Sequence, residues 1–228
     1  MSARRATLSV ADAFEERAVR RDGDRELPLG PKAQRTRAAI LDAATRLFWE
    51  QGYQATSVGD VANAAGVSLG TVYQYFRDRS DLVAALLQTH VTRMLGQTDA
   101  VWRASEGRAG LYRVLHNFVA FYAEQAEMAR VWEEVCHLDD DLADLRRALS
   151  RVFTDVVARE LRRAARAGLV RDDLDPGLAA AALAGMVDRF CYVTYVFDPP
   201  GDSPPAPEES ADLLTELWAS AVGLQSSS

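Results

Sequence analysis

Helical periodicity runs through almost all of this 228-residue sequence, and no segment shows the alternating polar and apolar pattern of a β-strand. Between Lys32 and Gln51, apolar residues recur on one helical face before Gly52 ends the segment. The residues of that face are Ile40, Leu41, Ala44, Leu47 and Phe48. We therefore predict an all-α fold, and the length allows one or two globular domains.

Capping residues and glycines divide the sequence into helices. Ser57, with Asp60 three residues later, has the pattern of a capping box and predicts a short helix that ends at Gly66. Ser68 and Asp78 are expected to cap the two helices that follow. Later helices are expected at about 79–104, 108–125, 127–136, 139–167, 176–197 and 208–223. The domains expected are a mobile N-terminal arm over 1–31, a compact three-helix domain over 32–80 and a larger helical domain over 81–228.

The segment from Val61 to Val72 has the spacing of a helix-turn-helix motif. Such a motif needs a small residue where the helices touch, a residue tolerant of positive φ in the turn, and an apolar residue that holds the second helix against the first. Ala62, Gly66 and Val72 occupy these three positions. An ordinary helical hairpin can carry the same short pattern, so the motif alone leaves both interpretations open.

The residues around this motif resemble the tetracycline-repressor (TetR) family of transcriptional regulators, over roughly residues 33–90. The segments that carry the resemblance are Arg35 to Phe48, Gly52-Tyr53, Thr56 to Val58, Asp60 to Ala62, Ala65 to Ser68, Gly70 to Tyr73, Tyr75-Phe76 and Arg79 to Leu82. The resemblance implies an N-terminal helix-turn-helix DNA-binding domain followed by a helical domain for ligand binding and dimerisation. Two features depart from the family pattern: Arg79 stands where lysine is usual, and the leader before Lys32 is long.

The third helix of such a domain enters the major groove of DNA, where base edges are distinguishable. We expect the segment from Ser68 to Tyr75 to face DNA, with Gly70 allowing a close approach of the backbone. The side chains expected at base edges are Leu69, Thr71, Gln74 and Tyr75. The resemblance implies phosphate contacts from Thr56, Ser57, Tyr73 and Arg79, and we expect further phosphate contacts from Arg35 and Arg37.

Six arginines lie in the leader, and acidic residues interrupt their series, which favours a solvated amphipathic segment over a DNA contact. These arginines are Arg4, Arg5, Arg17, Arg20, Arg21 and Arg25. The formal net charge of the chain is −7, with Lys and Arg totalling 26 against 33 Asp and Glu. Residues 1–81 carry a net +1 and residues 82–228 a net −8. This asymmetry permits an anionic partner at the N-terminal end without requiring one.

The last two expected helices are suited to forming a homodimer. The segment from Leu178 to Val196 is apolar on more than one face, so we expect it to bury surface against a second copy. The final helix would contribute Leu213, Leu214, Leu217, Trp218 and Val222. The family resemblance also implies a four-helix interface across a two-fold axis.

A set of aromatic, methionine and polar residues in the middle and later helices is the candidate lining of a pocket for a small-molecule inducer. The set comprises Trp102, His116, Phe118, Phe121, Tyr122, Met128, Trp132, Met186, Arg189 and Phe190. The same spacing also fits plain hydrophobic core, and both interpretations stay open. An inducer that fits this set is apolar or amphipathic.

No pattern in the sequence indicates catalysis, a metal site or a cofactor: the three histidines are scattered, and Cys136 and Cys191 lack zinc-ligand spacing. The start of the chain lacks a secretory pattern and no long apolar run indicates a membrane span, so we expect a cytoplasmic protein. The sequence therefore predicts a homodimeric, ligand-responsive repressor that binds a palindromic DNA operator, repression being implied by the resemblance alone. The alternative is a helical small-molecule or lipid-binding protein that does not bind an operator.

Overall fold

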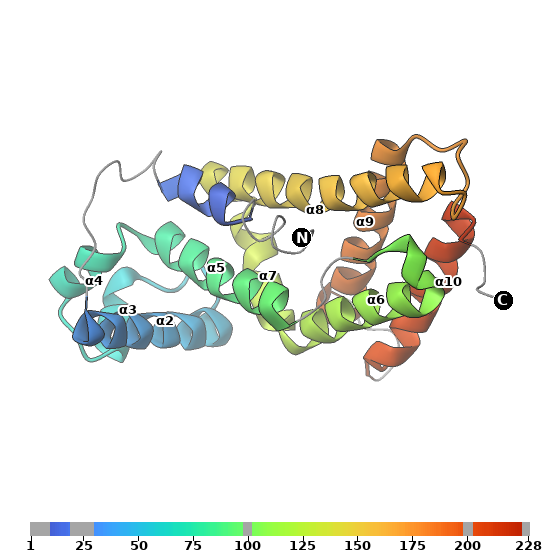
Figure 1. Cartoon of the computed structure of the whole chain (residues 1–228). Helices are drawn as coiled ribbons and strands as arrows, with labels where there is room; N and C mark the ends of the chain where they lie inside the picture. Colours follow the sequence, from blue (N-terminus) through green and yellow to red (C-terminus); the bar gives the residue numbers. More distant parts are fainter. Residues whose placement is uncertain (1–9, 19–29, 98–101, 198–202, 225–228) are drawn as a thin grey trace. The chain divides into compact units, whose positions relative to one another are not determined.

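The structure, a computed structural model, describes residues 10–18, 30–97, 102–197 and 203–224, and within these ranges it contains helices and no strands, which confirms the all-α prediction (Figure 1). A first helix covers residues 10–18. The later α-helices are α2 (Pro31–Gln51), α3 (Val58–Ala64), α4 (Leu69–Tyr75), α5 (Arg79–Gln97), α6 (Gly107–Glu124), α7 (Ala126–Val135), α8 (Asp140–Arg166), α9 (Pro176–Tyr192) and α10 (Pro207–Val222). A 3₁₀ turn (Ala104–Glu106) precedes α6, and a π-helical turn (Val193–Phe197) follows α9.

The expected caps form at the helix starts. Ser57 and Asp60 make a complete capping box at α3, and the Ser68 hydroxyl accepts a hydrogen bond from the Thr71 backbone N–H at α4. Asp78 accepts a hydrogen bond from the backbone N–H of Asp81 over 3.0 Å at the start of α5. Each side chain satisfies a backbone donor that has no partner within its own helix, so these local signals place the helix starts correctly.

Two expected helices are longer than the ones observed. The helix expected over 79–104 is observed from Arg79 to Gln97, and residues 98–101 lie outside the described residues. Arg103 has extended backbone angles before the short 3₁₀ turn, so the helix does not reach residue 104. The helix expected to reach Phe197 changes to π-helical geometry at Val193. Apolar periodicity continues through both regions, and periodicity alone does not reveal such a change of backbone geometry.

The chain forms two compact units. The N-terminal unit contains the described residues of 11–92 and 130–147, and the C-terminal unit contains Val10 and the described residues of 93–129 and 148–228. This division differs from the expected boundary between residues 80 and 81. Residues 130–147, from the end of α7 to the start of α8, group with the N-terminal unit because packing in space, not order along the chain, defines a unit.

The core of the C-terminal unit is built mainly from α6, α8, α9 and α10. Leu111, Val119, Ala180 and Leu214 are among its almost completely buried residues. Arg108 of α6 forms an ion pair with Glu216 of α10, and Tyr195 donates a hydrogen bond to Ser210 over 2.8 Å. Apolar burial thus joins helices that are far apart in the sequence.

Candidate DNA-binding site

The turn between α3 and α4 has the geometry that a helix-turn-helix motif requires. Gly66 has a φ of +67°, a left-handed conformation that residues with a Cβ adopt only at a cost. The backbone N–H of Val67 then bonds back to the carbonyl of Ala62 over 3.0 Å. Val61, Ala62 and Val72 are buried, so α4 is held against α3 by its apolar side. The spacing seen in the sequence therefore produces the expected turn.

The other side of α4 faces solvent. The side chains of Leu69 and Tyr73 expose 45% and 47% of their surface, and Ser68, Gly70 and Gln74 are exposed as well. Thr71 and Tyr75 are partly exposed. No acidic residue lies in α4, so the exposed side of this helix presents hydroxyl, amide, aromatic and aliphatic groups to an approaching partner. These are groups that can contact base edges and phosphates.

A groove runs beside α4 at the start of α3. Ser57, Gly59, Leu69, Tyr73 and Arg79 are among the residues that line it. Ser57 donates a hydrogen bond from its hydroxyl to the Asp60 carboxylate over 2.6 Å, and this bond, with a second from the Ser57 backbone, lowers the pKa of the Asp60 carboxyl. The groove thus borders the start of α3, where the side chains of Ser57 and Asp60 are hydrogen-bonded to each other and to the backbone.

Two residues expected to bind phosphate have other roles. Thr56 is completely buried, and its hydroxyl donates to the carbonyls of Leu47 and Gly52, so it joins α2 to the loop and does not reach the surface. The Nη1 of Arg79 donates to the carbonyls of Tyr53, Gln54 and Thr56 at 2.8–3.0 Å. The guanidinium also lies over the Tyr53 ring, 4.6 Å from its centre. Arg79 therefore closes the turn between α2 and α3 and is only partly exposed.

The arginines at the start of α2 differ in their surroundings. Arg35 is exposed, and its Nε donates to the carbonyl of Pro31 over 3.3 Å. Arg37 packs over the Phe76 ring at 5.4 Å, and burial lowers the pKa of its guanidinium. Of the two, Arg35 is the more accessible to a phosphate. Arg77, in the link between α4 and α5, is also exposed. It is absent from the DNA contacts predicted from the sequence, although a basic residue next to the predicted recognition helix indicates a phosphate contact.

The described helix of the leader, residues 10–18, differs from the solvated segment that we expect from the sequence. In the helix over residues 10–18, Phe14 and Arg17 are buried, with 7% and 5% of their surface exposed. A buried guanidinium cannot contact a phosphate of DNA, so neither interpretation of Arg17 was correct. The amphipathic pattern was real, but the face that carries Arg17 packs against protein. Arg4, Arg5, Arg20, Arg21 and Arg25 lie outside the described residues.

The candidate pocket residues fall into several environments. Trp102, Phe118, Tyr122, Met186 and Phe190 all belong to, or pack against, the core of the C-terminal unit. Met128 is buried and Phe121 is partly buried with Arg93 over its ring. His116 stacks on Tyr112 and lies 3.4 Å from Glu208. Arg189 is exposed and its guanidinium lies over the Tyr192 ring, so it does not supply a polar group to the interior of the C-terminal unit. Trp132 belongs to the N-terminal unit.

A two-helix unit with a left-handed glycine turn, and a second helix exposed along its polar side, defines a helix-turn-helix DNA-binding protein. Comparison with known proteins agrees with this class. Residues 40–86 match the bacterial regulatory proteins of the tetR family, and residues 104–206 match the tetracyclin repressor-like C-terminal domain.

Among known proteins, the transcriptional regulator TtgR of Pseudomonas putida is 30% identical over 166 residues, which cover 69% of this chain and 79% of TtgR. The solved structure of SmeT, the repressor of a multidrug efflux pump of Stenotrophomonas maltophilia, is 25% identical with a TM-score of 0.63, covering 81% of this chain and 89% of SmeT. NalD of Pseudomonas aeruginosa shares the fold at 23% identity, with a TM-score of 0.68 over 84% of this chain and 97% of NalD. The chain belongs to the TetR family and is a DNA-binding transcriptional regulator.

Proposed function

We propose that the protein is a homodimeric repressor that binds a palindromic operator through α4 of each protomer and leaves it when a small apolar or amphipathic molecule binds. The observation that carries this proposal is the exposure of α4: Val72 is completely buried while Leu69 and Tyr73 are almost half exposed. A helix held by one side and open along the other can be inserted into a major groove without unfolding any part of the unit.

The surface of α9 and α10 supports dimerisation. Leu178 of α9 exposes 74% of its surface, and Leu213 and Leu217 of α10 expose 49% and 47%. Ala181, Ala182 and Gly185 are also exposed, at spacings that place them on one face of α9 with Leu178. Exposed apolar groups on two neighbouring helices are typical of an interface. Of the seam residues expected in α10, Leu214, Trp218 and Val222 are buried in the protomer's own core, so only Leu213 and Leu217 remain available.

The same face explains why Pro176–Phe197 is apolar enough, by length and composition, to pass for a membrane-spanning helix. One side of this segment packs in the protomer's core through Ala180, Leu183 and Val187. A second copy would cover the other side. A helix that is buried on two sides is apolar all round, as a membrane-spanning helix is, although no membrane surrounds it. We propose that the protein acts in the cytoplasm.

The character of the effector is inferred from the core of the C-terminal unit. Partly buried Phe118, Tyr122, Met186 and Phe190 pack against this core, and aromatic and thioether side chains suit an apolar or amphipathic molecule. SmeT has been solved in complex with triclosan, a small molecule of this kind. Triclosan is therefore a reasonable first probe for this chain.

The experiment that tests the proposal selects duplexes from a random pool with the full-length protein and measures binding to the enriched sequence. We expect a palindrome bound at a nanomolar scale, with two protomers per duplex and a steep dependence on salt. Triclosan is then added to the complex and should raise the Kd. If no duplex is enriched although triclosan binds, the protein is a helical small-molecule-binding protein and operator binding is refuted.

A further inference from the structure

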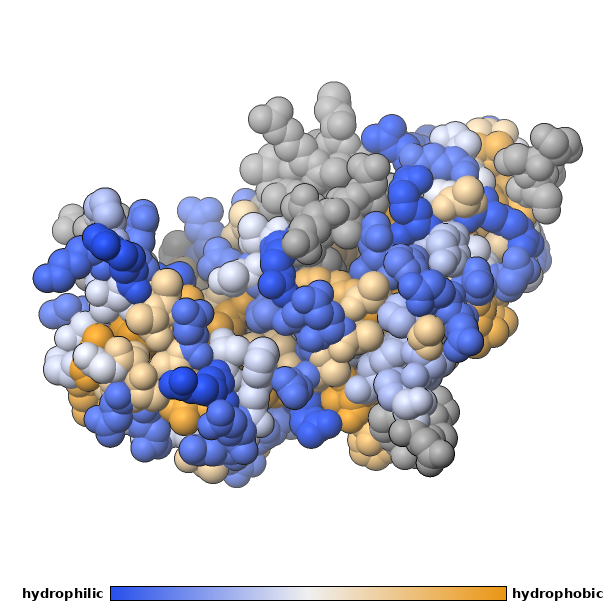
Figure 2. Space-filling view, turned by 90° about the horizontal axis from the view of Figure 1, so that it is seen from below, coloured by the Kyte–Doolittle hydropathy of each residue, from blue (hydrophilic) through white to orange (hydrophobic). Residues whose placement is uncertain are grey.

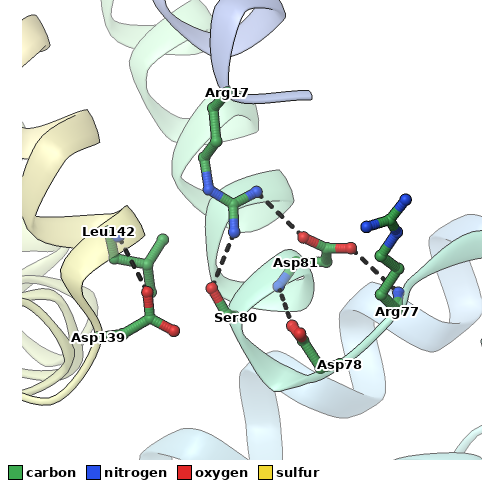
Figure 3. Close-up of polar contacts among 7 residues, drawn as sticks. All are labelled: Arg17, Arg77, Asp78, Ser80, Asp81, Asp139 and Leu142. Carbon is green, nitrogen blue, oxygen red and sulfur yellow. Dashed lines mark hydrogen bonds and ion pairs between the residues drawn. The ribbon is translucent and has the colours of Figure 1, made fainter. Parts of the chain in front are cut away.

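The helix over residues 10–18 contributes a buried arginine to the start of α5 (Figure 3). The two terminal nitrogens of Arg17 have different partners: Nη1 donates to Oδ1 of Asp81 over 3.1 Å, and Nη2 donates to Oγ of Ser80 over 2.8 Å. The side chains of Arg17 and Asp81 expose only 6% and 11% of their surface. All three residues belong to the N-terminal unit. The helix over residues 10–18 is thus fixed to the first turn of α5 by a buried ion pair and a hydrogen bond.

The carboxylate of Asp81 carries this contact to the end of α4. Its second oxygen, Oδ2, accepts a hydrogen bond from the backbone N–H of Arg77 over 3.0 Å (Figure 3). Only residues 76–78 connect the last residue of α4 to the first residue of α5. Phe76 within this link is buried. Because the link is short and Asp81 holds it from the α5 side, the orientation of α4 depends on where Asp81 is held.

We propose that Arg17 is a positioning residue for DNA recognition, which acts through Asp81 and Ser80 on the link between α4 and α5. The leader helix is then a functional part of the DNA-reading unit, although it lies outside the segment that matches the family and touches no DNA. The inference rests on the proposed operator binding. It adds to that function a residue on which sequence selectivity depends.

The physical basis is the cost of weakening the compensation of a mostly buried charge. Removal of the guanidinium leaves the Asp81 carboxylate, whose side chain is only 11% exposed, with less compensation, and such a carboxylate shifts toward solvent. That shift withdraws the acceptor from the Arg77 backbone N–H and frees the link. Specific binding needs α4 at one angle in the groove, whereas nonspecific binding depends on phosphate contacts that Arg17 does not make. Selectivity is therefore expected to fall without loss of nonspecific affinity.

The test uses the full-length protein and measures Kd for the selected palindrome and for a scrambled duplex of the same length. Arg17→Ala is expected to raise Kd for the palindrome about tenfold per protomer, the effect of a lost hydrogen bond to a charged group, and thus roughly one hundredfold for a homodimer. Kd for the scrambled duplex should stay unchanged. Arg17→Lys keeps one positive charge near Asp81 and should recover part of the loss. Glu16→Ala, an exposed change on the same helix, is the matched control and should bind as the wild type does.

The outcomes separate the alternatives. If Arg17→Ala weakens binding equally on both duplexes and reduces the salt slope, Arg17 contacts phosphate. If both Kd values stay unchanged and only the melting temperature falls, the role of Arg17 is purely structural. Either result overturns the proposal. If Arg17→Ala does not fold, Ser80→Ala removes the Ser80 hydrogen bond to Arg17 and keeps the ion pair of Arg17 with Asp81. Because Arg17 is then held less firmly beside Asp81, selectivity should still fall. Wild-type protein that selects no duplex would refute operator binding itself, and this inference with it.

Discussion

Tyr73 is the residue whose role can be tested with the smallest change. Its side chain is 47% exposed and lines the groove beside Ser57 and Arg79. If the phenol donates to a DNA phosphate, Tyr73→Phe removes one hydrogen bond to a charged group, about 1.5 kcal/mol at the low end of the usual range. A homodimer loses two such bonds, about 3 kcal/mol, which corresponds to an increase in Kd of roughly one hundredfold. The ring remains, so the melting temperature should hardly change.

The salt dependence of binding makes this prediction sharper. The phenol is neutral and displaces no counterion, so the slope of log Kd against log salt should be the same for Tyr73→Phe and the wild type. Arg35→Ala is the comparison: loss of one phosphate contact in each of two protomers should reduce that slope by about 1.8. Fluorescence anisotropy with the selected duplex at several salt concentrations measures both quantities. Tyr73→Phe protein that binds with the wild-type Kd would refute the docking of α4 described above.

Three further predictions concern the turn, the dimer and the thiols. Gly66→Ala should lower the unfolding free energy by about 1–2 kcal/mol, because Gly66 has a positive φ. A Cβ at this position meets no neighbouring atom, so the loss comes from the backbone conformation alone. Gly66→Asn should lose less, because asparagine tolerates positive φ, and calorimetry measures both changes. Gly185→Trp should give a folded monomer by light scattering, because a Cβ at this position meets no atom of its own protomer within 4 Å. A persisting dimer would exclude this face as the dimer interface. Burial raises the pKa of the Cys191 thiol from 9.0 to about 12, so this thiol should resist iodoacetamide at pH 8 until the protein unfolds. Because the thiol of the unfolded chain ionises first, the free energy of unfolding should fall as the pH rises from about 9 toward 12. Rapid labelling of folded protein, seen by mass spectrometry, would contradict its burial.

The surface of the molecule shows why exposure is difficult to predict from sequence. Figure 2 shows one face on which hydrophobic side chains interrupt a mostly hydrophilic surface. Leu69, Leu178, Leu213 and Leu217 are exposed, whereas Leu214 and Trp218 in the same helix as Leu213 are buried. All are apolar, so the sequence groups them together. Which of them a neighbouring helix covers depends on packing that composition does not describe.

Local chemistry along the chain was enough to place the starts of α3, α4 and α5. A serine or aspartate that satisfies free backbone N–H groups, and a glycine that tolerates positive φ, act within four or five residues. This is why the roles of Ser57, Ser68, Gly66 and Asp78 follow from the sequence alone. The family resemblance extended these local signals to a class of protein.

Partners distant in the sequence were decided by the tertiary structure alone. Arg79 and Arg17 each have a guanidinium that suits phosphate, yet the fold directs that of Arg79 to the backbone carbonyls of Tyr53 and Thr56, and that of Arg17 to the Ser80 and Asp81 side chains. Arg17 and Asp81 are 64 residues apart, and no periodicity or cap links them. Folding in three dimensions brings these groups to their acceptors, and a group that folding takes out of water must find a partner inside the protein.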